Sequence, residues 1–199
     1  MILHRCFAWN RGARADAVDG PLWFPQIYQG EGRHDNPDEY GCLYLADRPV
    51  SCIVEQLAAF RGQRLSSSLL RRRGLPLALA AIELDDKAKL VDLDAPAILI
   101  RERLRPSVIA TRDRRVTQPQ ALDLYRLHRQ SAGLKWWSNW ESQWGNVTLF
   151  DRAATALHLV DVRELTLDDP ATEEAAEWFG LLATSGIGRF RTIGGRVGL

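Results

Sequence analysis

The apolar residues of this chain fall into short runs separated by polar, turn-rich stretches. Residues 42–46 form one such run, long enough for a buried strand. The runs 77–84 and 90–93 flank residues 85–87, which predicts two strands joined by a short turn. Strand-like composition also marks the segments 134–138, 146–150 and 156–162. The twenty residues after Cys6 are punctuated by glycine and proline, and we expect them to form loops.

Helical spacing follows the first of these strands. Apolar residues recur at steps of three and four and form a core-facing stripe of Val50, Ile53, Val54, Leu57 and Phe60. We expect Asp47 to cap this helix and Pro49 to occupy its first turn, where the missing N–H does no harm. The helix is predicted to run to about Phe60 and to stop near Gly62.

Two later helices are predicted from the residues at their ends. The first opens at residues 117–119, runs to about Ala132 and ends at Gly133, a residue type favoured after a helix C-terminus. The second begins at residues 168–170 and runs to about Ala183.

Short mixed strands with a few flanking helices predict a single α+β domain. The chain has 199 residues, the length of one domain, and it has no internal repeat and no low-complexity linker. We place the domain at residues 1–183 and expect the glycine-rich segment 184–199 to be a loosely ordered tail.

The charge balance argues against nucleic acid as the main partner. The chain has 26 basic and 25 acidic residues, a net charge of +1, whereas domains that bind nucleic-acid backbone are usually strongly basic. No apolar run approaches the roughly 20 residues that span a bilayer, and the N-terminus lacks the features of a signal peptide. We therefore expect a soluble, cytoplasmic protein whose three cysteines, Cys6, Cys42 and Cys52, are reduced thiols.

The common catalytic and metal-binding motifs are missing from the sequence. The histidines are scattered without a pair at ligand spacing, and the cysteines fit no metal pattern. Cys42 and Cys52 lie in apolar runs and are typical of core residues. The chain also has no Walker loop, no GxGxxG and no Gly-x-Ser-x-Gly elbow. We expect no metal site.

Arginine accounts for all but three of the basic residues. Codon bias explains such a composition, but arginine also holds phosphate and carboxylate groups with two parallel hydrogen bonds. The run 71–73 and the arginine-rich stretch 101–115, which has no assignable secondary structure, form either solvated surface or a patch for an acidic partner or nucleic acid. Composition does not choose between these interpretations.

Two further features have both a structural and a functional interpretation. Four tryptophans lie within nine residues and either pack a core or stack on a base or a nicotinamide ring: Trp136, Trp137, Trp140 and Trp144. Glu55 lies opposite the apolar stripe of its helix, beside the small residues Ser51, Ala58 and Ala59. It is either a solvated glutamate or a carboxylate that projects into a ligand cleft, and periodicity does not decide between the two.

Several stretches resemble the signature of the RES-domain family. The main ones are Gly32-Arg33-His34-Asp35-Asn36-Pro37, Leu43-Tyr44-Leu45-Ala46-Asp47-Arg48-Pro49 and Glu55. Three further blocks also resemble the family: Leu3-His4-Arg5, Val91-Asp92-Leu93-Asp94 and Gly133-Leu134-Lys135-Trp136-Trp137-Ser138. The resemblance covers roughly residues 3–151. The chain departs from the family pattern at His34-Asp35, where a single aromatic residue is usual, and at Trp137, where proline is usual.

RES-domain proteins are toxins of bacterial toxin–antitoxin pairs, similar in fold to ADP-ribosyltransferases, that degrade NAD⁺ by hydrolysis or phosphorolysis of the nicotinamide–ribose bond. The resemblance implies the same reaction here, with NAD⁺ as substrate, no cofactor or metal, and water or inorganic phosphate as acceptor. Such a cleavage develops positive charge on the ribose, which a nearby carboxylate stabilises.

The resemblance implies roles for five residues. Glu55, Arg33 and Ser138 are the expected catalytic residues, with Glu55 beside the ribose. Arg5, Arg33, Tyr44 and Ser138 are expected to bind NAD⁺. The two arginines would clamp its phosphates, Tyr44 would pack on the nicotinamide or ribose, and the Ser138 hydroxyl would hydrogen-bond the nicotinamide–ribose part.

A partner is implied as well, an antitoxin of the Xre (helix-turn-helix) type encoded beside the toxin, and a homodimer within the toxin–antitoxin complex is compatible with this. Three alternatives stay open. The same site would serve transfer of ADP-ribose to a protein acceptor. The tryptophan and arginine patches would suit a non-catalytic module that binds nucleic acid or protein. The changes at His34-Asp35 and Trp137 would suit an inactive RES-like domain.

Overall fold

The structure, a computed structural model, describes residues 1–180, so the predicted tail 184–199 lies outside the described residues. The strands are β1 (Ile2–Ala8), β2 (Cys42–Ala46), β3 (Arg71–Arg72), β4 (Leu75–Leu84), β5 (Leu90–Asp92), β6 (Gly133–Trp137), β7 (Gly145–Phe150) and β8 (Leu157–Glu164). The α-helices are α1 (Pro49–Leu57), α2 (Pro96–Arg101), α3 (Pro106–Ala110), α4 (Arg114–Leu127) and α5 (Pro170–Phe179). Short strands and flanking helices thus alternate irregularly, and the predicted α+β class is confirmed.

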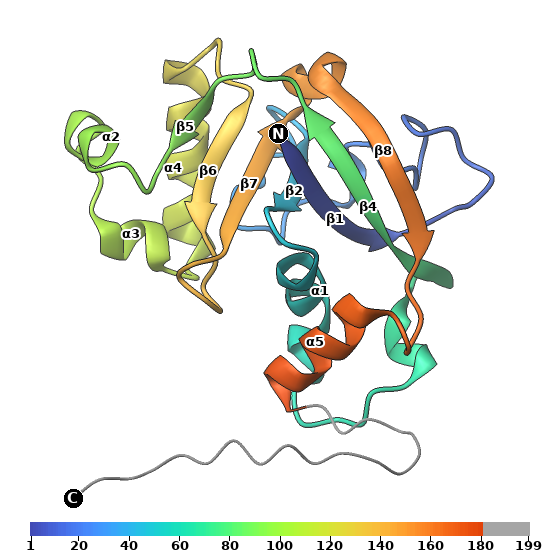
Figure 1. Cartoon of the computed structure of the whole chain (residues 1–199). Helices are drawn as coiled ribbons and strands as arrows, with labels where there is room; N and C mark the ends of the chain where they lie inside the picture. The colour runs from blue at the N-terminus through green and yellow to red at the C-terminus, as the bar shows by residue number, and fades with distance from the viewer. Residues whose placement is uncertain (181–199) are drawn as a thin grey trace, which may run out of the picture.

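The strands form a mixed sheet that divides into two halves. Its order is β3-β4-β1-β2-β7-β6-β5, and β8 pairs with β4 on the edge that β4 also shares with β3. β1 pairs with β4 along its whole length, but it meets β2 at one position, where His4 lies opposite Ala46. The halves diverge from there, with β1, β4 and β8 on one side and β5, β6 and β7 on the other (Figure 1).

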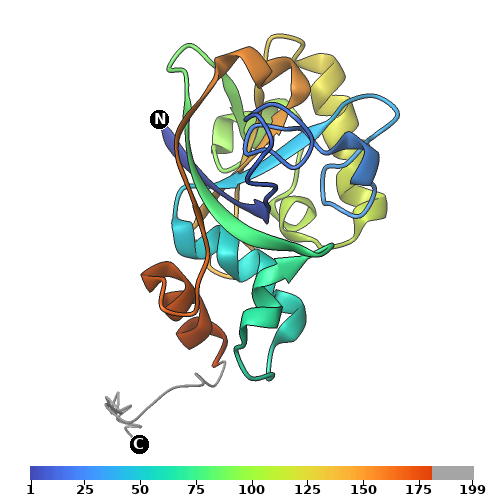
Figure 2. The same cartoon turned by 90° about the vertical axis from the view of Figure 1, so that its right-hand side faces the viewer.

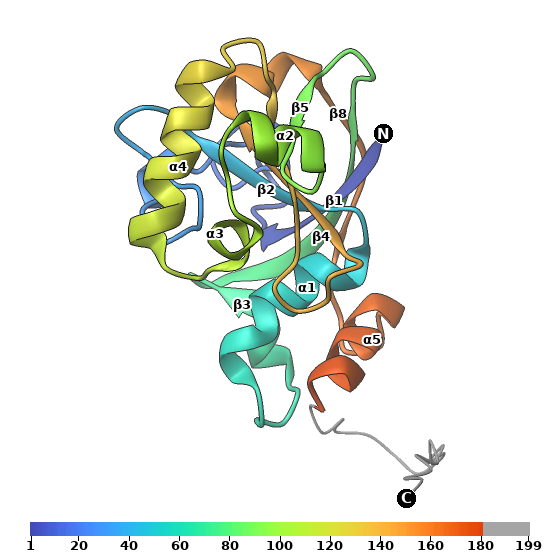
Figure 3. The ribbon, with the colours of Figure 1, turned by 90° about the vertical axis from the view of Figure 1, so that its left-hand side faces the viewer.

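Apolar side chains pack in three clusters between these layers. One joins the two halves of the sheet, for example Leu3 and Ile82 from the first half with Leu43 and Leu149 from the second. Another lies where α1 and α5 pack side by side against β1 and β4 (Figure 2). The third lies between α3, α4 and the strands β5, β6 and β7 (Figure 3). Each half of the sheet is therefore covered by its own helices.

Helix α1 follows its predicted apolar stripe. Its four stripe residues are buried, namely Val50, Ile53, Val54 and Leu57. The helix continues into a short 3-10 helix, η2 (Ala58–Phe60), whose Phe60 packs against the same cluster. The predicted cap is wrong, because Arg48 occupies the N-cap and Asp47 accepts a hydrogen bond from the backbone N–H of Gly145 at 3.0 Å. Asp47 therefore ties the start of α1 to β7 instead.

The predicted hairpin between residues 77–84 and 90–93 is wrong. Both strands exist, but β4 lies between β1 and β8, and β5 pairs in parallel with β6. One edge of β4 is taken by β1, a strand that the sequence analysis did not predict, and the other by β8, so neither edge is left for β5. Tertiary pairing thus overrides the local turn signal of residues 85–87.

The last two predicted helices are present with shifted ends. Helix α4 begins earlier than predicted, because the Asp113 side chain caps it by accepting from the N–H of Arg115, and it ends at Leu127. Gly133 does not follow this helix; it is the first residue of β6. Helix α5 is capped by Asp169 and ends at Gly180, whose φ of 61° is left-handed. Residues 181–183, assigned to this helix from the sequence, lie outside the described residues.

None of the helices within residues 1–180 has the length and apolarity needed to cross a membrane.

Gly133 offers a direct test of the strand packing. A Cβ at this position would lie 2.2 Å from the Thr148 carbonyl oxygen and 2.8 Å from Leu149 Cα, both on β7. We expect Gly133→Ala to lower the free energy of unfolding by about 1–3 kcal/mol, because backbone atoms must move to admit the methyl group. Gly12→Ala is the matched control, since the nearest atom to its Cβ would be 3.6 Å away. Equal melting temperatures for the two variants would contradict the β6–β7 packing described here.

Candidate active site

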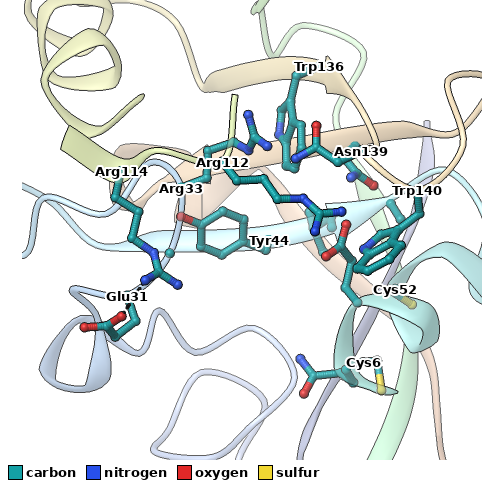
Figure 4. Close-up of a pocket in the computed structure, with 16 residues that line it drawn as sticks. Cys6, Glu31, Arg33, Tyr44, Cys52, Arg112, Arg114, Trp136, Asn139 and Trp140 are labelled. Carbon is teal, nitrogen blue, oxygen red and sulfur yellow. Dashed lines mark hydrogen bonds and ion pairs between the residues drawn. The ribbon is translucent and has the colours of Figure 1, made fainter. Parts of the chain in front are cut away.

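A cavity of about 410 Å³ opens beside the position where β1 and β2 diverge. Its volume lies within the usual range for small-molecule sites, about 300–1,000 Å³. It is lined by Cys6, Glu31, Gly32, Arg33, Tyr44, Leu45, Ala46, Cys52, Glu55, Gln56, Arg112, Arg114, Trp136, Asn139, Trp140 and Asn146. Figure 4 shows that the polar side chains among them converge from separate elements of the fold.

Glu55 projects from α1 into this cavity. The apolar stripe faces the opposite way, into the core, so the helix presents Glu55 on its open side. The protein atoms around the carboxylate raise the pKa of Glu55 above its ordinary value by desolvation. Hydrogen bonds from the Trp140 and Ser138 side chains and the positive charges of Arg33 and Arg112 lower the same pKa, with a smaller effect than burial. Periodicity left open whether Glu55 is a solvated glutamate or projects into a cleft, and in the structure it lines a cavity.

Ser138 contacts Glu55 from the end of β6. Its hydroxyl donates to Glu55 Oε1 at 3.4 Å and accepts from the backbone N–H of Trp140 at 3.1 Å. Only 2% of Ser138 is exposed, and its backbone N–H donates to the Trp144 carbonyl at 2.8 Å. Ser138 therefore supports the Glu55 carboxylate from behind and is not itself among the residues that line the cavity.

Arg33 lies across the face of Trp136. Its guanidinium carbon is 4.7 Å from the centroid of that ring, and one of its N–H groups donates to the Ile109 carbonyl. Burial lowers the pKa of Arg33, and the Glu55 charge raises it. Because a guanidinium has five N–H donors in a planar fork, this stacked arrangement leaves donors for a ligand in the cavity.

Trp136 is itself fixed by a buried polar group. Its indole N–H donates to Thr148 Oγ1 at 3.0 Å, and the same oxygen lies 2.8 Å from Nδ1 of His34. Burial lowers the pKa of His34 to about 3, so its imidazole is neutral at physiological pH. His34, one of the departures from the resemblance noted above, thus holds the wall on which Arg33 rests.

Tyr44 fastens the loop that carries Arg33. Its hydroxyl donates to Asp35 Oδ1 at 2.7 Å and accepts from the backbone N–H of His34 at 2.9 Å. The other carboxylate oxygen of Asp35 accepts from the N–H groups of Gly30 and Gly32, at 2.9 and 2.6 Å. The Tyr44 hydroxyl is thus engaged within the protein, and the residue still lines the cavity.

Arg5 lies in a second, smaller cavity of about 200 Å³. The two cavities share Cys6, Tyr44 and Gln56 as lining residues, so they adjoin. Arg5 is buried, and one of its nitrogens donates to the carbonyls of Gly20 and Pro21, at 3.1 and 2.7 Å. Burial lowers the pKa of Arg5 to about 9. The structure therefore does not bring Arg5 to the Glu55 cavity itself but to its neighbour.

Within residues 1–180, no group of histidine, cysteine, aspartate and glutamate side chains is arranged to hold a metal ion. Burial raises the pKa of each of the three thiols, and the cysteines are core residues, as predicted for Cys42 and Cys52.

A sequence model of the family described as the RES domain matches residues 2–171. The chain belongs to the RES-domain family. No curated protein matches it by sequence.

A solved structure has a similar fold. It is the crystal structure of the M. tuberculosis MbcT–MbcA toxin–antitoxin complex, with a TM-score of 0.63. The similarity covers 90% of this chain and 88% of that chain at 19% sequence identity, a level at which it shows the fold alone. The RES domain thus has a mixed α/β fold that it shares with a chain of that complex, and its expected likeness to ADP-ribosyltransferases stays a prediction.

The RES domain brings together four of the five residues singled out from the sequence. Arg33, Tyr44 and Glu55 line one cavity, and Ser138 contacts Glu55 directly. Arg5 lines the adjoining cavity. The roles assigned to these residues stay predictions.

Sequence reasoning missed several residues that line the cavity. Chief among them is Arg112, whose guanidinium carbon lies 4.4 Å from the centroid of the Trp140 ring, close enough to Glu55 to lower its pKa. Arg114 also lines the cavity and pairs with Glu31 at 2.7 Å. The arginine-rich stretch was the available signal, but nothing in it distinguishes Arg112 from its neighbours. Trp144 is buried in the core, as one interpretation of the tryptophans has it, whereas Trp136 and Trp140 line the cavity, where stacking on a ligand ring stays a prediction.

The Tyr44 hydroxyl gives a test of how the Arg33 loop is held. We expect Tyr44→Phe to lower the free energy of unfolding by about 1–3 kcal/mol, because Asp35 and the His34 N–H each lose a buried partner. Chemical denaturation measures the effect. Tyr28→Phe is the control, since Tyr28 is 53% exposed and should change stability little. If both variants unfold at the same denaturant concentration, the Tyr44 hydroxyl does not fasten the loop.

Proposed function

We propose that this RES domain is the toxin of a bacterial toxin–antitoxin pair and that it degrades NAD⁺ by cleaving the bond between nicotinamide and ribose. The observation that carries the proposal is Glu55, a carboxylate held by Ser138 and Trp140 at the wall of a cavity and flanked by Arg33 and Arg112. Family membership and the fold shared with a chain of a toxin–antitoxin complex support it.

The chemistry of the bond explains why a carboxylate is needed. When the bond between ribose C1′ and the nicotinamide nitrogen breaks, its electron pair leaves with neutral nicotinamide, and the ribose becomes an oxocarbenium-like cation. An ionised Glu55 beside the ribose stabilises this charge as it develops. Ser138 hydrogen-bonds Glu55 and accepts a hydrogen bond from the backbone N–H of Trp140, and it thereby holds the carboxylate in place before the charge appears. Little reorganisation is then needed in the transition state.

The arginines suit the diphosphate of the substrate. Arg33 and Arg112 each rest on a tryptophan ring in the main cavity, which limits their freedom before a ligand binds. Arg5, with Arg72 and Arg73, lines the adjoining cavity. A dinucleotide is long enough to need more than one compartment, so the two cavities would take its two halves with Tyr44 between them. Phosphate oxygens would then be within reach of arginines from both sides.

The acceptor in the second step is water or inorganic phosphate. Attack of water on ribose C1′ gives ADP-ribose, and attack of phosphate gives its 1″-phosphate. Transfer to a protein side chain is the alternative reaction at the same site. Resolving the products after incubation of the purified chain with NAD⁺, with and without phosphate, separates these outcomes, and no loss of NAD⁺ in either case would contradict the proposal.

Glu55→Gln tests the catalytic carboxylate. The change preserves size and removes the negative charge, so we expect kcat to fall about 10²–10³-fold. The free energy of unfolding should change by less than about 0.5 kcal/mol, because glutamine keeps the size and helix propensity of glutamate and its amide oxygen can still accept from Ser138. NAD⁺ consumption and thermal melting measure the two effects.

The control for this variant is Glu83→Gln, an exposed glutamate on β4 away from the cavity. It should consume NAD⁺ at the parental rate. A folded Glu55→Gln protein with parental turnover would remove the carboxylate from the mechanism.

Arg33→Lys tests the binding of phosphate. Lysine keeps the charge but loses the planar fork and the stacking on Trp136, so we expect KM for NAD⁺ to rise more than kcat falls. Steady-state kinetics at several NAD⁺ concentrations gives both constants. Arg101→Lys, an exposed arginine on α2, is the control and should leave both constants unchanged. An unchanged KM in Arg33→Lys would instead assign Arg33 to fastening its own loop.

Growth of a bacterial host tests the toxin and its partner. A protein that consumes a central cofactor in the cytoplasm must be held inactive, and we propose an Xre-type antitoxin encoded beside it. Expression of this chain alone should stop growth, and co-expression of the neighbouring gene should restore it. Growth arrest should be absent for Glu55→Gln. Normal growth of cells that contain active protein and no partner would contradict this part of the proposal.

A further inference from the structure

Helix α5 and the loop between β6 and β7 share an aromatic cluster, of which the proposed mechanism uses only Trp140. The cluster consists of Trp140 and Trp144 from the loop and Trp178 and Phe179 from α5. The match to the RES family ends at residue 171, so Trp178 and Phe179 lie beyond it. The end of the last described helix, which the family match does not include, is therefore in contact with a wall of the cavity.

The ring of Trp140 is fixed on one side by α5. Its centroid lies 5.2 Å from that of Phe179 at an interplanar angle of 79°, and 6.5 Å from that of Trp178 at 85°. Trp178 is in turn 5.3 Å from Trp144, which is buried in the core. These are edge-to-face or tilted arrangements, which specify the orientation of a ring as well as its position. The plane of the Trp140 indole thus depends on two side chains of α5.

On its other side, Trp140 lines the cavity and contacts residues of the candidate active site. Its backbone N–H donates to Ser138 Oγ at 3.1 Å, and the same hydroxyl donates to Glu55 Oε1 at 3.4 Å. Its ring face carries the Arg112 guanidinium at 4.4 Å. Trp140 therefore contacts Ser138 and Arg112, two residues that act on the Glu55 carboxylate, and Figure 4 shows it beside Arg112 at one end of the cavity.

We propose that Trp178 is a positioning residue, through which α5 holds Trp140 in the place from which it supports Ser138 and Arg112 beside the Glu55 carboxylate. The end of α5, which lies beyond the family match, would then complete the active site of this protein. The inference rests on the proposed function, because Glu55 is given its catalytic role there. The coupling between Trp178 and Glu55 is measurable without catalysis.

The docking of α5 does not depend on Trp178. The helix packs on α1 and the sheet through buried residues, among them Ala175, Ala176 and Phe179, while Trp178 is 41% exposed. Replacing Trp178 should therefore leave the helix in place and change mainly the packing around Trp140. A variant at this position separates positioning from folding.

The first experiment measures the pKa of the Glu55 carboxyl by NMR titration of the full chain. Because the Ser138 hydrogen bond and the Arg112 charge both favour the ionised carboxylate, their weakening in Trp178→Ala should raise the pKa of Glu55, by about half a unit or more. Trp178→Phe keeps an aromatic ring and should restore most of the parental value. Glu174→Ala, an exposed position one turn earlier on α5, is the matched control and should leave it unchanged.

The second experiment follows NAD⁺ consumption by the same variants. We expect kcat of Trp178→Ala to fall about tenfold or more, with a smaller change in KM, because a misplaced carboxylate weakens the transition state more than substrate binding. The acidic limb of the kcat profile should move to higher pH, since a Glu55 carboxyl with a raised pKa loses its proton only at higher pH. Trp178→Phe should recover most of the rate.

Each outcome decides the proposal. A folded Trp178→Ala chain with parental Glu55 titration overturns it, whatever the activity. If Trp178→Ala does not fold, Trp178→Leu, which keeps apolar volume but not the aromatic edge, takes its place in the same titration. If the Glu55 pKa moves as expected while the parent consumes no NAD⁺, the positioning role stands and the proposed function fails.

Discussion

The pairing of β1 with β2 at a single position is the constraint on which the rest of this structure depends. β1 follows β4 along its whole length and β2 follows β7, but within the described residues β1 and β2 pair only where His4 lies opposite Ala46. Beyond that position, side chains of β1 and β2, including Cys6 and Tyr44, line cavities instead of packing on each other. Apolar side chains from both halves, such as Leu3 and Leu43, hold the divided sheet together from one face. Packing thus stabilises the two separated halves of the sheet, and their separation leaves room for the cavities of the site.

The electrostatics of the site follow from this arrangement. Glu55 lies in a recess where desolvation disfavours its charge, and Arg33 and Arg112 with two hydrogen-bonding side chains offset part of that effect. Both arginines are backed by tryptophan rings, which orient the guanidinium planes without neutralising them. The cavity therefore combines one carboxylate with several cationic groups, a distribution that suits a ligand with a developing positive charge at one end and phosphates at the other.

Local patterns were reliable where one element decides the outcome. The stripe of α1 predicted both its buried residues and the open side on which Glu55 lies, because the helical period alone sets which side chains share a face. The same reasoning failed at residues 85–87, where a good turn signal did not produce a hairpin, and at Gly133, whose small size serves the close approach of β7 and not a helix end. In both places the deciding contact is with a strand distant in sequence.

The sequence by itself determined many of the elements, the α+β class, the family and the set Arg33, Tyr44 and Glu55, since spacing and motif are properties of neighbouring residues. Only the tertiary structure decided how the strands pair, which of the many arginines reach the cavity, and that α5 supports Trp140. Those outcomes depend on hydrogen bonds and ring contacts between segments far apart in the chain. The sequence pattern shows which face of a helix or strand is apolar. Which other element packs on that face depends on how all the strands and helices pair and pack in the folded chain.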